Sequence, residues 1–125
     1  MNGSLQASAQ VNPNTAKRAS PLLVRIYELK SPTAFNSADF ISLLDRDQAT
    51  LGADLVAREE IVLQPGEVRA YNKTLAPEVK FIAVIGTYRD LEHSRWRSVA
   101  AVTPNKTQKL LVKAEELAIT ATITP

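Results

Sequence analysis

The single histidine, His93, is the first residue to weigh for catalysis, because an imidazole changes charge near neutral pH and can act as a general base. Ser94 follows it, but the chain contains no G-x-S-x-G motif of the kind that presents a serine nucleophile. A nucleophile also needs an oriented base beside it. The sequence therefore favours an exposed loop histidine, ranks a hydrolase well below the other hypotheses, and leads us to expect no catalytic residue.

Paired carboxylates occur twice, at Glu59-Glu60 and at Glu115-Glu116. Two carboxylates can share acid and base roles when they flank one bond of a substrate. Neighbouring residues on a strand point to opposite faces, so neither pair can do this. One histidine, no cysteine and scattered acids give no metal-ligand pattern, and the four glycines form no phosphate-binding cluster. We expect neither a metal nor a cofactor.

Trp96 could stack on a sugar ring or a base, because it lies between two arginines. It also shares an alternating pattern with Ser98, Ala100 and Val102, which favours a buried side chain in the core. The remaining large polar aromatics are spread over three predicted strands, at Tyr27, Tyr71 and Tyr88. The spacing of these residues does not predict an aromatic platform.

The polar stretch from Asn12 to Ser20 contains no apolar residue larger than alanine, apart from one proline, and carries the adjacent cations Lys17 and Arg18. A two-residue turn would be enough to reverse the chain between two strands. Long loops in compact domains are either tolerated surface segments or functional ones. The Lys17-Arg18 pair would suit an acidic protein surface, so this loop is the best candidate for a binding site.

The bulk composition is that of one globular domain. The chain has 125 residues, of which 45% are hydrophobic and 22% charged. The 15 basic and 13 acidic residues are interspersed along the chain, which argues against a nucleic-acid partner. The absence of cysteine excludes a disulfide framework. With this even charge balance and no obvious apolar patch, we expect a monomer in solution.

The elements that must position these residues are mainly strands. Residues 21–30 are apolar on both faces, which is typical of a strand in the middle of a sheet, and residues 80–88 form the most hydrophobic run. Further alternating segments cover residues 5–11, 54–63, 68–75, 96–102, 109–113 and 117–124.

Turns separate these segments at short intervals, so we predict a two-sheet antiparallel β-sandwich of about eight strands. We expect the loop at 12–20 and the turn at 64–67 each to close a hairpin. Helical spacing predicts a helical insertion at about residues 33–50, after the second strand. Its helix would cover roughly residues 37–45 and be capped by Asn36 or Ser37.

Short motifs in a fixed order carry a family resemblance. They are Asn12-Pro13, Ser20-Pro21 with the segment from Leu22 to Leu29, Phe35, Ala38-Asp39-Phe40, Leu43-Leu44, Leu51-Gly52, Leu63 to Gly66, Tyr88-Arg89 and Trp96-Arg97. Over residues 5–125 the chain resembles the outer-membrane lipoprotein family of the type VI secretion system, known as TssJ or SciN. The sequence lacks the cysteine that is lipidated in that family, and residues 1–4 look like an addition left from expression, so we treat residues 5–125 as the domain.

The resemblance implies a transthyretin-like fold and a structural, non-catalytic role. It implies an anchor in the outer membrane through a lipid-modified N-terminal cysteine, with the domain facing the periplasm of a Gram-negative bacterium. It also implies that the domain binds the periplasmic C-terminal region of the inner-membrane protein TssM. The contact loop of the family corresponds here to six residues: Asn14, Thr15, Ala16, Lys17, Arg18 and Ala19.

A second hypothesis is a periplasmic β-sandwich that binds glycan or peptidoglycan fragments. It would use Trp96 and neighbouring tyrosines as its stacking residues.

Overall fold

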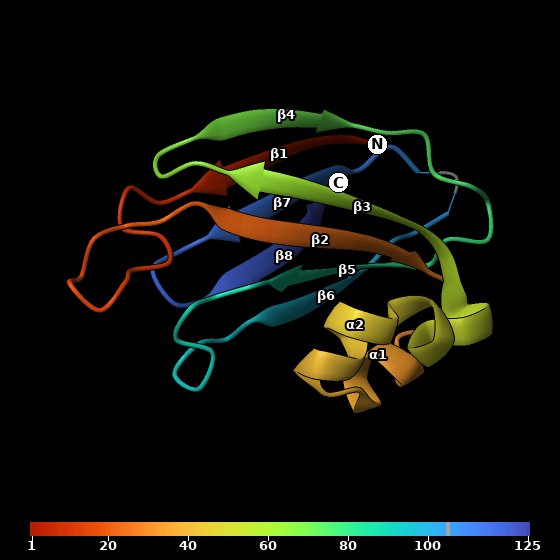
Figure 1. Ribbon diagram of the computed structural model, residues 1–125. Helices are drawn as coiled ribbons and strands as arrows, with labels where there is room; N and C mark the ends of the chain where they lie inside the picture. Colours follow the sequence, from red (N-terminus) through yellow and green to blue (C-terminus); the bar gives the residue numbers. More distant parts are fainter. Residues whose placement is uncertain (105) are drawn as a thin grey trace.

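The computed structural model describes residues 1–104 and 106–125, and the described residues form two packed four-stranded sheets. In spatial order the sheets are β4-β1-β7-β8 and β3-β2-β5-β6, so the predicted β-sandwich is confirmed (Figure 1). The strands are β1 Asn2–Ala7, β2 Leu22–Leu29, β3 Leu55–Leu63, β4 Val68–Asn72, β5 Phe81–Gly86, β6 Arg97–Ala101, β7 Lys109–Ala114 and β8 Ile119–Thr124. No helix in the described part of the chain has the length and apolarity needed to cross a membrane.

The main core lies between the two sheets. β2 contributes Leu22, Val24 and Ile26, none of which is more than 1% exposed. From the opposite sheet, Leu5 and Val112 pack into the same cluster. Removing an aliphatic side chain of this kind from water stabilises the fold by about 1.5 to 3 kcal/mol. The two strands predicted to be central, β2 and β5, are the two inner strands of their sheet.

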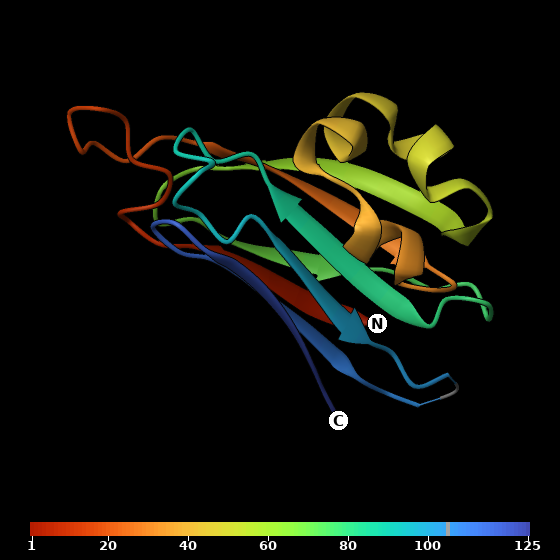
Figure 2. The ribbon, with the colours of Figure 1, turned by 90° about the horizontal axis from the view of Figure 1, so that it is seen from below.

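The other face of β2 is covered by the helical insertion, which explains why both faces of this strand are apolar. The insertion consists of α1 (Thr33–Ser37), α2 (Phe40–Leu51) and the 3-10 helix η1 (Gly52–Asp54). Tyr27 and Leu29 of β2 form a second buried cluster with Phe35, Leu43 and Leu51 from the helices. Figure 2 shows that the helices lie against one sheet only.

The predicted insertion is present, but its helix boundaries and cap were wrong. Ala38 adopts an extended conformation and separates α1 from α2. The residue that caps α2 is Asp39, whose carboxylate accepts a hydrogen bond from the backbone N–H of Ser42 at 2.8 Å. Aspartate accepts this bond as well as asparagine or serine does. The pKa of Asp39 is correspondingly lowered, first by its hydrogen bonds with Ser42.

Two arginines on the outer face of the sheet hold the insertion in place. The guanidinium of Arg25 donates hydrogen bonds to the carbonyls of Leu43 and Leu44, each at 3.1 Å, and to the carboxylate of Asp47 at 3.2 Å. These carbonyls lie next to a break in α2 at Arg46, whose φ of −141° is not helical. Arg25 therefore satisfies carbonyl groups near the point where the helix is interrupted.

Arg97 likewise binds backbone carbonyl groups in and just after α1. Its guanidinium donates to the carbonyls of Phe35 at 2.9 Å and Ala38 at 2.8 Å. The hydroxyl of Tyr27 accepts a hydrogen bond from the guanidinium of Arg25. Burial of this phenol is the main cause that raises its pKa to about 12.

Both predicted hairpins were wrong. The loop after β1 leads to β2, and the turn after β3 leads to β4, yet in each case the two strands belong to different sheets. β1 instead pairs with β4, and it also pairs in parallel with β7, so the sandwich is not purely antiparallel. A stretch of turn-forming residues indicates only that the chain reverses direction there. The choice of pairing partner depends on contacts between residues that are distant in sequence.

The first strand begins earlier than predicted, at Asn2 instead of residue 5, and ends at Ala7. Asn2, Gly3 and Ser4 pair with both β4 and β7. Gly3 fits closely, because a Cβ atom there would lie 2.9 Å from the carbonyl oxygen of Tyr71. The interpretation of residues 1–4 as an addition from expression stays a prediction, although three of these residues belong to the sheet.

Candidate partner-binding site

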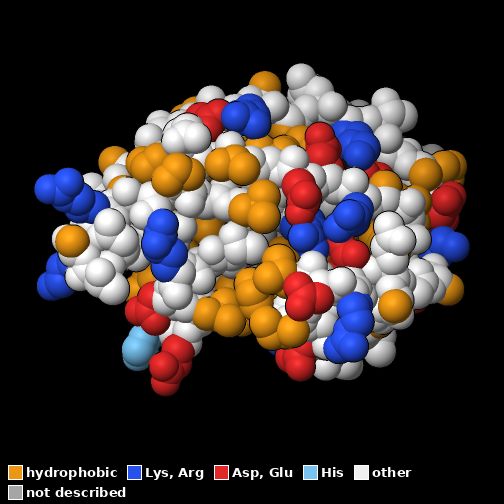
Figure 3. All heavy atoms as spheres, viewed as in Figure 1, with side chains coloured by type: hydrophobic (Ala, Val, Ile, Leu, Met, Phe, Trp, Pro, Cys, Tyr) orange, Lys and Arg blue, Asp and Glu red, His pale blue; other side chains and the backbone are white. Residues whose placement is uncertain are grey.

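The loop between β1 and β2 projects from one end of the sandwich, and Met1 lies at the opposite end of β1 (Figure 1). Three other connections meet at the same end as this loop: the turn between β3 and β4, the loop between β5 and β6, and the turn between β7 and β8. Lys and Arg side chains project there (Figure 3). The loop is therefore presented at the end of the sandwich farthest from the start of the chain.

The base of the loop is anchored in the core. Val11 is fully buried, and its carbonyl accepts a hydrogen bond from the N–H of Ser20 at 3.0 Å. Asn12 is only 3% exposed, and it has a positive φ of 51°, a conformation that asparagine tolerates better than most residues. Its amide nitrogen donates to the carbonyl of Pro21 at 2.9 Å, and its amide oxygen accepts from the N–H of Arg89 at 2.8 Å.

The backbone N–H of Asn12 also donates to the carbonyl of Glu116 at 3.0 Å. One buried asparagine thus joins three connections that are far apart in sequence. This bonding limits how far the loop can move relative to its neighbours.

The tip of the loop is folded on itself around Asn14. The side-chain oxygen of Asn14 accepts hydrogen bonds from the N–H groups of Ala16 at 2.9 Å and Arg18 at 3.0 Å. Its carbonyl accepts from the N–H of Lys17 at 2.9 Å, and Lys17 has a φ of 61°. An asparagine that bonds to nearby backbone groups in this way stabilises a tight turn. The tip therefore has a defined shape before any partner binds.

The six predicted site residues lie together on this tip. Thr15, Ala16, Lys17 and Arg18 are exposed, whereas Asn14 and Ala19 are partly buried. Neither cation forms an ion pair with any described residue. The tip therefore offers free polar and cationic groups to solvent.

Sequence reasoning missed three charged neighbours of the tip: Arg89, Asp90 and Glu116. Together with Pro13, Asn14, Thr15 and Lys17 from the loop, they line a groove of about 630 Å³. Asn12 and Arg89 are 77 positions apart in the chain, so no local pattern could have linked them.

The groups considered for catalysis are not assembled. His93 is exposed and contacts Asp90 at 2.9 Å, and the hydrogen bond to this carboxylate is the main cause that raises the pKa of the imidazole. The hydroxyl of Ser94 donates to the carbonyl of Leu91, not to His93. The adjacent acids Glu59 and Glu60 point to different cations. Among the described residues, no three acidic, histidine or cysteine side chains are placed to hold a metal ion.

The aromatic residues do not form a stacking surface for a glycan. All three tyrosines are buried, with exposures of 0%, 7% and 4% in chain order, namely Tyr27, Tyr71 and Tyr88. Trp96 is partly buried, so the prediction of a core side chain holds only in part. Phe40 packs against it in a T-shaped arrangement with a centroid distance of 5.0 Å, and the guanidinium of Arg97 lies over the ring at 4.4 Å from its centroid. Protein groups thus occupy the surfaces of Trp96 that a sugar would need.

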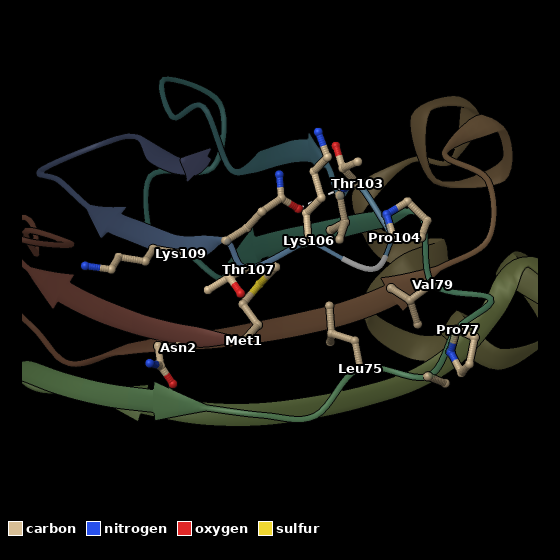
Figure 4. A pocket seen from close by; sticks show the side chains of 13 residues that line it. Met1, Asn2, Leu75, Pro77, Val79, Thr103, Pro104, Lys106, Thr107 and Lys109 are labelled. Atoms are coloured by element: carbon tan, nitrogen blue, oxygen red, sulfur yellow. Dashed lines mark hydrogen bonds between the residues drawn. The ribbon is translucent and has the colours of Figure 1, made fainter. Parts of the chain in front are cut away.

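A second hollow, of about 430 Å³, lies at the other end of the sandwich beside Met1 (Figure 4). Apolar side chains such as Leu75 and Val79 line part of it, together with Lys106 from the β6–β7 connection and Lys109 from the start of β7. None of the predicted site residues is near this hollow.

Comparison with known proteins identifies relatives over the full sandwich. The family model T6SS-SciN, described as type VI secretion lipoprotein, VasD, EvfM and TssJ, matches residues 1–117. The crystal structure of the T6SS lipoprotein TssJ1 from Pseudomonas aeruginosa is 39% identical, with a TM-score of 0.94 over 99% of this chain and 95% of that chain. No curated protein matches the chain in sequence.

Two further solved structures share the fold. A chain of the structure described as the T6SS protein TssM C-terminal domain from EAEC is 26% identical, with a TM-score of 0.80 over 97% of this chain and 98% of that chain. The Serratia marcescens Lip protein, described as a membrane-bound component of the type VI secretion system, is 23% identical, with a TM-score of 0.79 over 94% of both chains. The family match and the identity to TssJ1 agree, and the chain belongs to the TssJ family of type VI secretion lipoproteins.

Proposed function

We propose that this protein is a non-catalytic assembly component of the type VI secretion system, which binds the periplasmic C-terminal region of TssM through the loop tip, Asn14 to Ala19. The observation that carries the proposal is a chain of the same fold and length in the structure named for the TssM C-terminal domain. Membership of the TssJ family supports the same partner.

The geometry of the loop suits this role. Its tip is exposed, while its base is held by the buried residues Val11 and Asn12. A binding element that is already ordered loses less conformational entropy when it binds. The exposed cations Lys17 and Arg18 would attract an acidic surface and speed association.

We also propose that the protein is held at the outer membrane by a lipid-modified cysteine and faces the periplasm. An anchor that preceded Met1 would join the sandwich at the end opposite the loop. The loop would then point away from the membrane, toward a partner that crosses the periplasm. An anchor with several acyl chains would make this attachment durable, because one chain alone gives only marginal binding.

The proposal is tested by isothermal titration calorimetry with the purified periplasmic C-terminal domain of TssM from the same organism. We compare the chain with a variant in which residues 14–19 are replaced by glycine and serine. A matched control carries Lys106→Ser and Lys109→Ser, which remove two cations at the other end of the sandwich. We expect the wild-type chain and the control to bind, and the loop variant not to bind. Absence of binding by the wild-type chain would reject the proposed partner.

A further inference from the structure

The groove beside the loop tip is built by three separate connections. Lys17 lies on one wall, Arg89 and Asp90 come from the β5–β6 loop, and Glu116 comes from the turn between β7 and β8. The buried side chain of Asn12 and its backbone N–H bond directly to the backbone of Arg89 and Glu116. The walls of the groove are thus held in a fixed relation to the loop.

Charges of both signs meet at this groove. Within residues 1–104 and 106–125, Lys17, Arg89 and Glu116 form no ion pair, and their side chains form no hydrogen bond. Asp90 contacts only the exposed His93 among the described charged groups. Elsewhere the sandwich pairs many of its charges, as in the network that links Arg25, Asp47, Arg58 and Glu60.

A partner would gain most from charges that are free before binding. A group that already has an intramolecular ion pair must give up that interaction, whereas Lys17, Arg89 and Glu116 need not. Complementary charges at an interface set the orientation of the partner and exclude incorrect partners, because like charges placed together are costly. A groove with cations and anions therefore selects a segment that presents both signs in the matching order.

We propose that this groove binds a segment of the protein partner that carries an acidic and a basic side chain close together. The acidic side chain lies against Lys17 and Arg89, and the basic side chain lies against Asp90 and Glu116. This inference rests on the proposed function, because it assigns a second part of the same interface. It extends the contact surface beyond the loop tip to two connections that are distant in sequence.

The test uses single charge reversals, Arg89→Glu and Glu116→Lys, titrated calorimetrically against the TssM domain. Both residues are exposed, and their side chains form no ion pair with the residues that the structure describes, so the variants should keep the wild-type melting temperature. We expect each reversal to weaken binding about tenfold at low salt, with the difference shrinking as salt is added. Matched controls are Lys113→Glu and Glu78→Lys, two exposed residues outside the groove, which should leave the affinity unchanged.

Each outcome separates this inference from the proposed function. If both reversals bind like the wild-type chain while the glycine-serine loop variant does not bind, the groove plays no part and the loop assignment stands. If Arg89→Glu weakens binding but Glu116→Lys strengthens it, the partner presents only acidic groups and the two-signed groove is rejected. If the wild-type chain does not bind, the partner itself is wrong, and both proposals fail.

Discussion

At the scale of single residues, Asn12 links the loop to the body of the protein. It is nearly fully buried, and both ends of its side-chain amide are used, one toward Pro21 and one toward Arg89. Removing one partner of a buried hydrogen bond leaves the other unsatisfied, which costs more than the bond contributes on balance. The position of the loop tip relative to the sandwich therefore depends on these hydrogen bonds of Asn12.

We expect Asn12→Ala to lower the free energy of unfolding by about 2 to 4 kcal/mol, because the carbonyl of Pro21 and the N–H of Arg89 lose their partner and alanine disfavours a positive φ. Urea denaturation measures this loss. The control Asn36→Ala removes the same side chain from an exposed position and should change stability by about 0.5 kcal/mol or less. Equal effects of the two substitutions would contradict the role of Asn12.

The cations of the loop tip allow a test of function without a change in fold. Lys17→Asp combined with Arg18→Asp should abolish binding to the TssM domain, because an attractive surface becomes repulsive. Both side chains are exposed and unpaired among the described residues, so stability should change by only about 0.5 kcal/mol. Calorimetric titration and thermal melting measure the two quantities. Lys106→Asp combined with Lys113→Asp is the matched control, and unchanged affinity in the loop variant would reject the assignment.

At the scale of elements, the helical insertion depends on the sheet beneath it. α1 is very short, and α2 is interrupted at Arg46, so neither helix would be stable alone. Burial of Phe35, Leu43 and Leu51 against β2 and β5 supplies most of the stabilisation. Arg25 and Arg97 then bind the carbonyl groups that the irregular helices leave free.

We expect Arg25→Met to destabilise the protein by about 3 to 5 kcal/mol, because Asp47 loses its buried cationic partner and keeps only the exposed Arg58 among the described residues, and the carbonyls of Leu43 and Leu44 lose their donor. Hydrogen exchange should accelerate first at residues 40–51. Arg46→Met, which alters an exposed side chain on the same helix, should leave exchange in α2 nearly unchanged. Uniform acceleration over the whole chain would show that Arg25 supports the entire fold and not this insertion in particular.

At the scale of the whole molecule, the two edges of the sandwich differ. On the β6 and β8 side the sheets are joined by backbone hydrogen bonds, from the N–H of Arg95 to the carbonyl of Leu117 at 2.8 Å and from the N–H of Ile119 to the carbonyl of Arg95 at 2.9 Å. On the other side β3 and β4 are edge strands with one neighbour each. The bonded edge connects the two sheets into one unit.

We therefore expect a single cooperative unfolding transition. Trp96 is the only tryptophan, and it packs against both the core between the sheets and the cluster beneath the helices. Its fluorescence should change at the same urea concentration as the circular dichroism of the strands, which is the standard test of two-state behaviour. Two separate midpoints would contradict this, and would mean that the helical insertion unfolds on its own.

The interior of the sandwich was predictable because it depends on local patterns. Apolar residues on both faces of residues 22–29 required a buried strand, and the hydrophobic run at 81–86 required another. The polar composition of residues 12–20 identified an exposed loop, and the tip at residues 14–19 is indeed where the structure places exposed cations. Periodicity predicts which residues are buried, but it carries no information on which strands pair.

The sequence by itself determined the class of fold, the number of strands, the central strands and the polar loop, since hydrophobic alternation and turn residues act over a few neighbouring positions. Only the tertiary structure decided that β1 and β2 lie in different sheets, that Asn12 joins three connections, and that Arg89, Asp90 and Glu116 lie beside the loop. These features depend on contacts between segments far apart in the chain. Such contacts form when the two sheets bury a common core, and no local pattern records them.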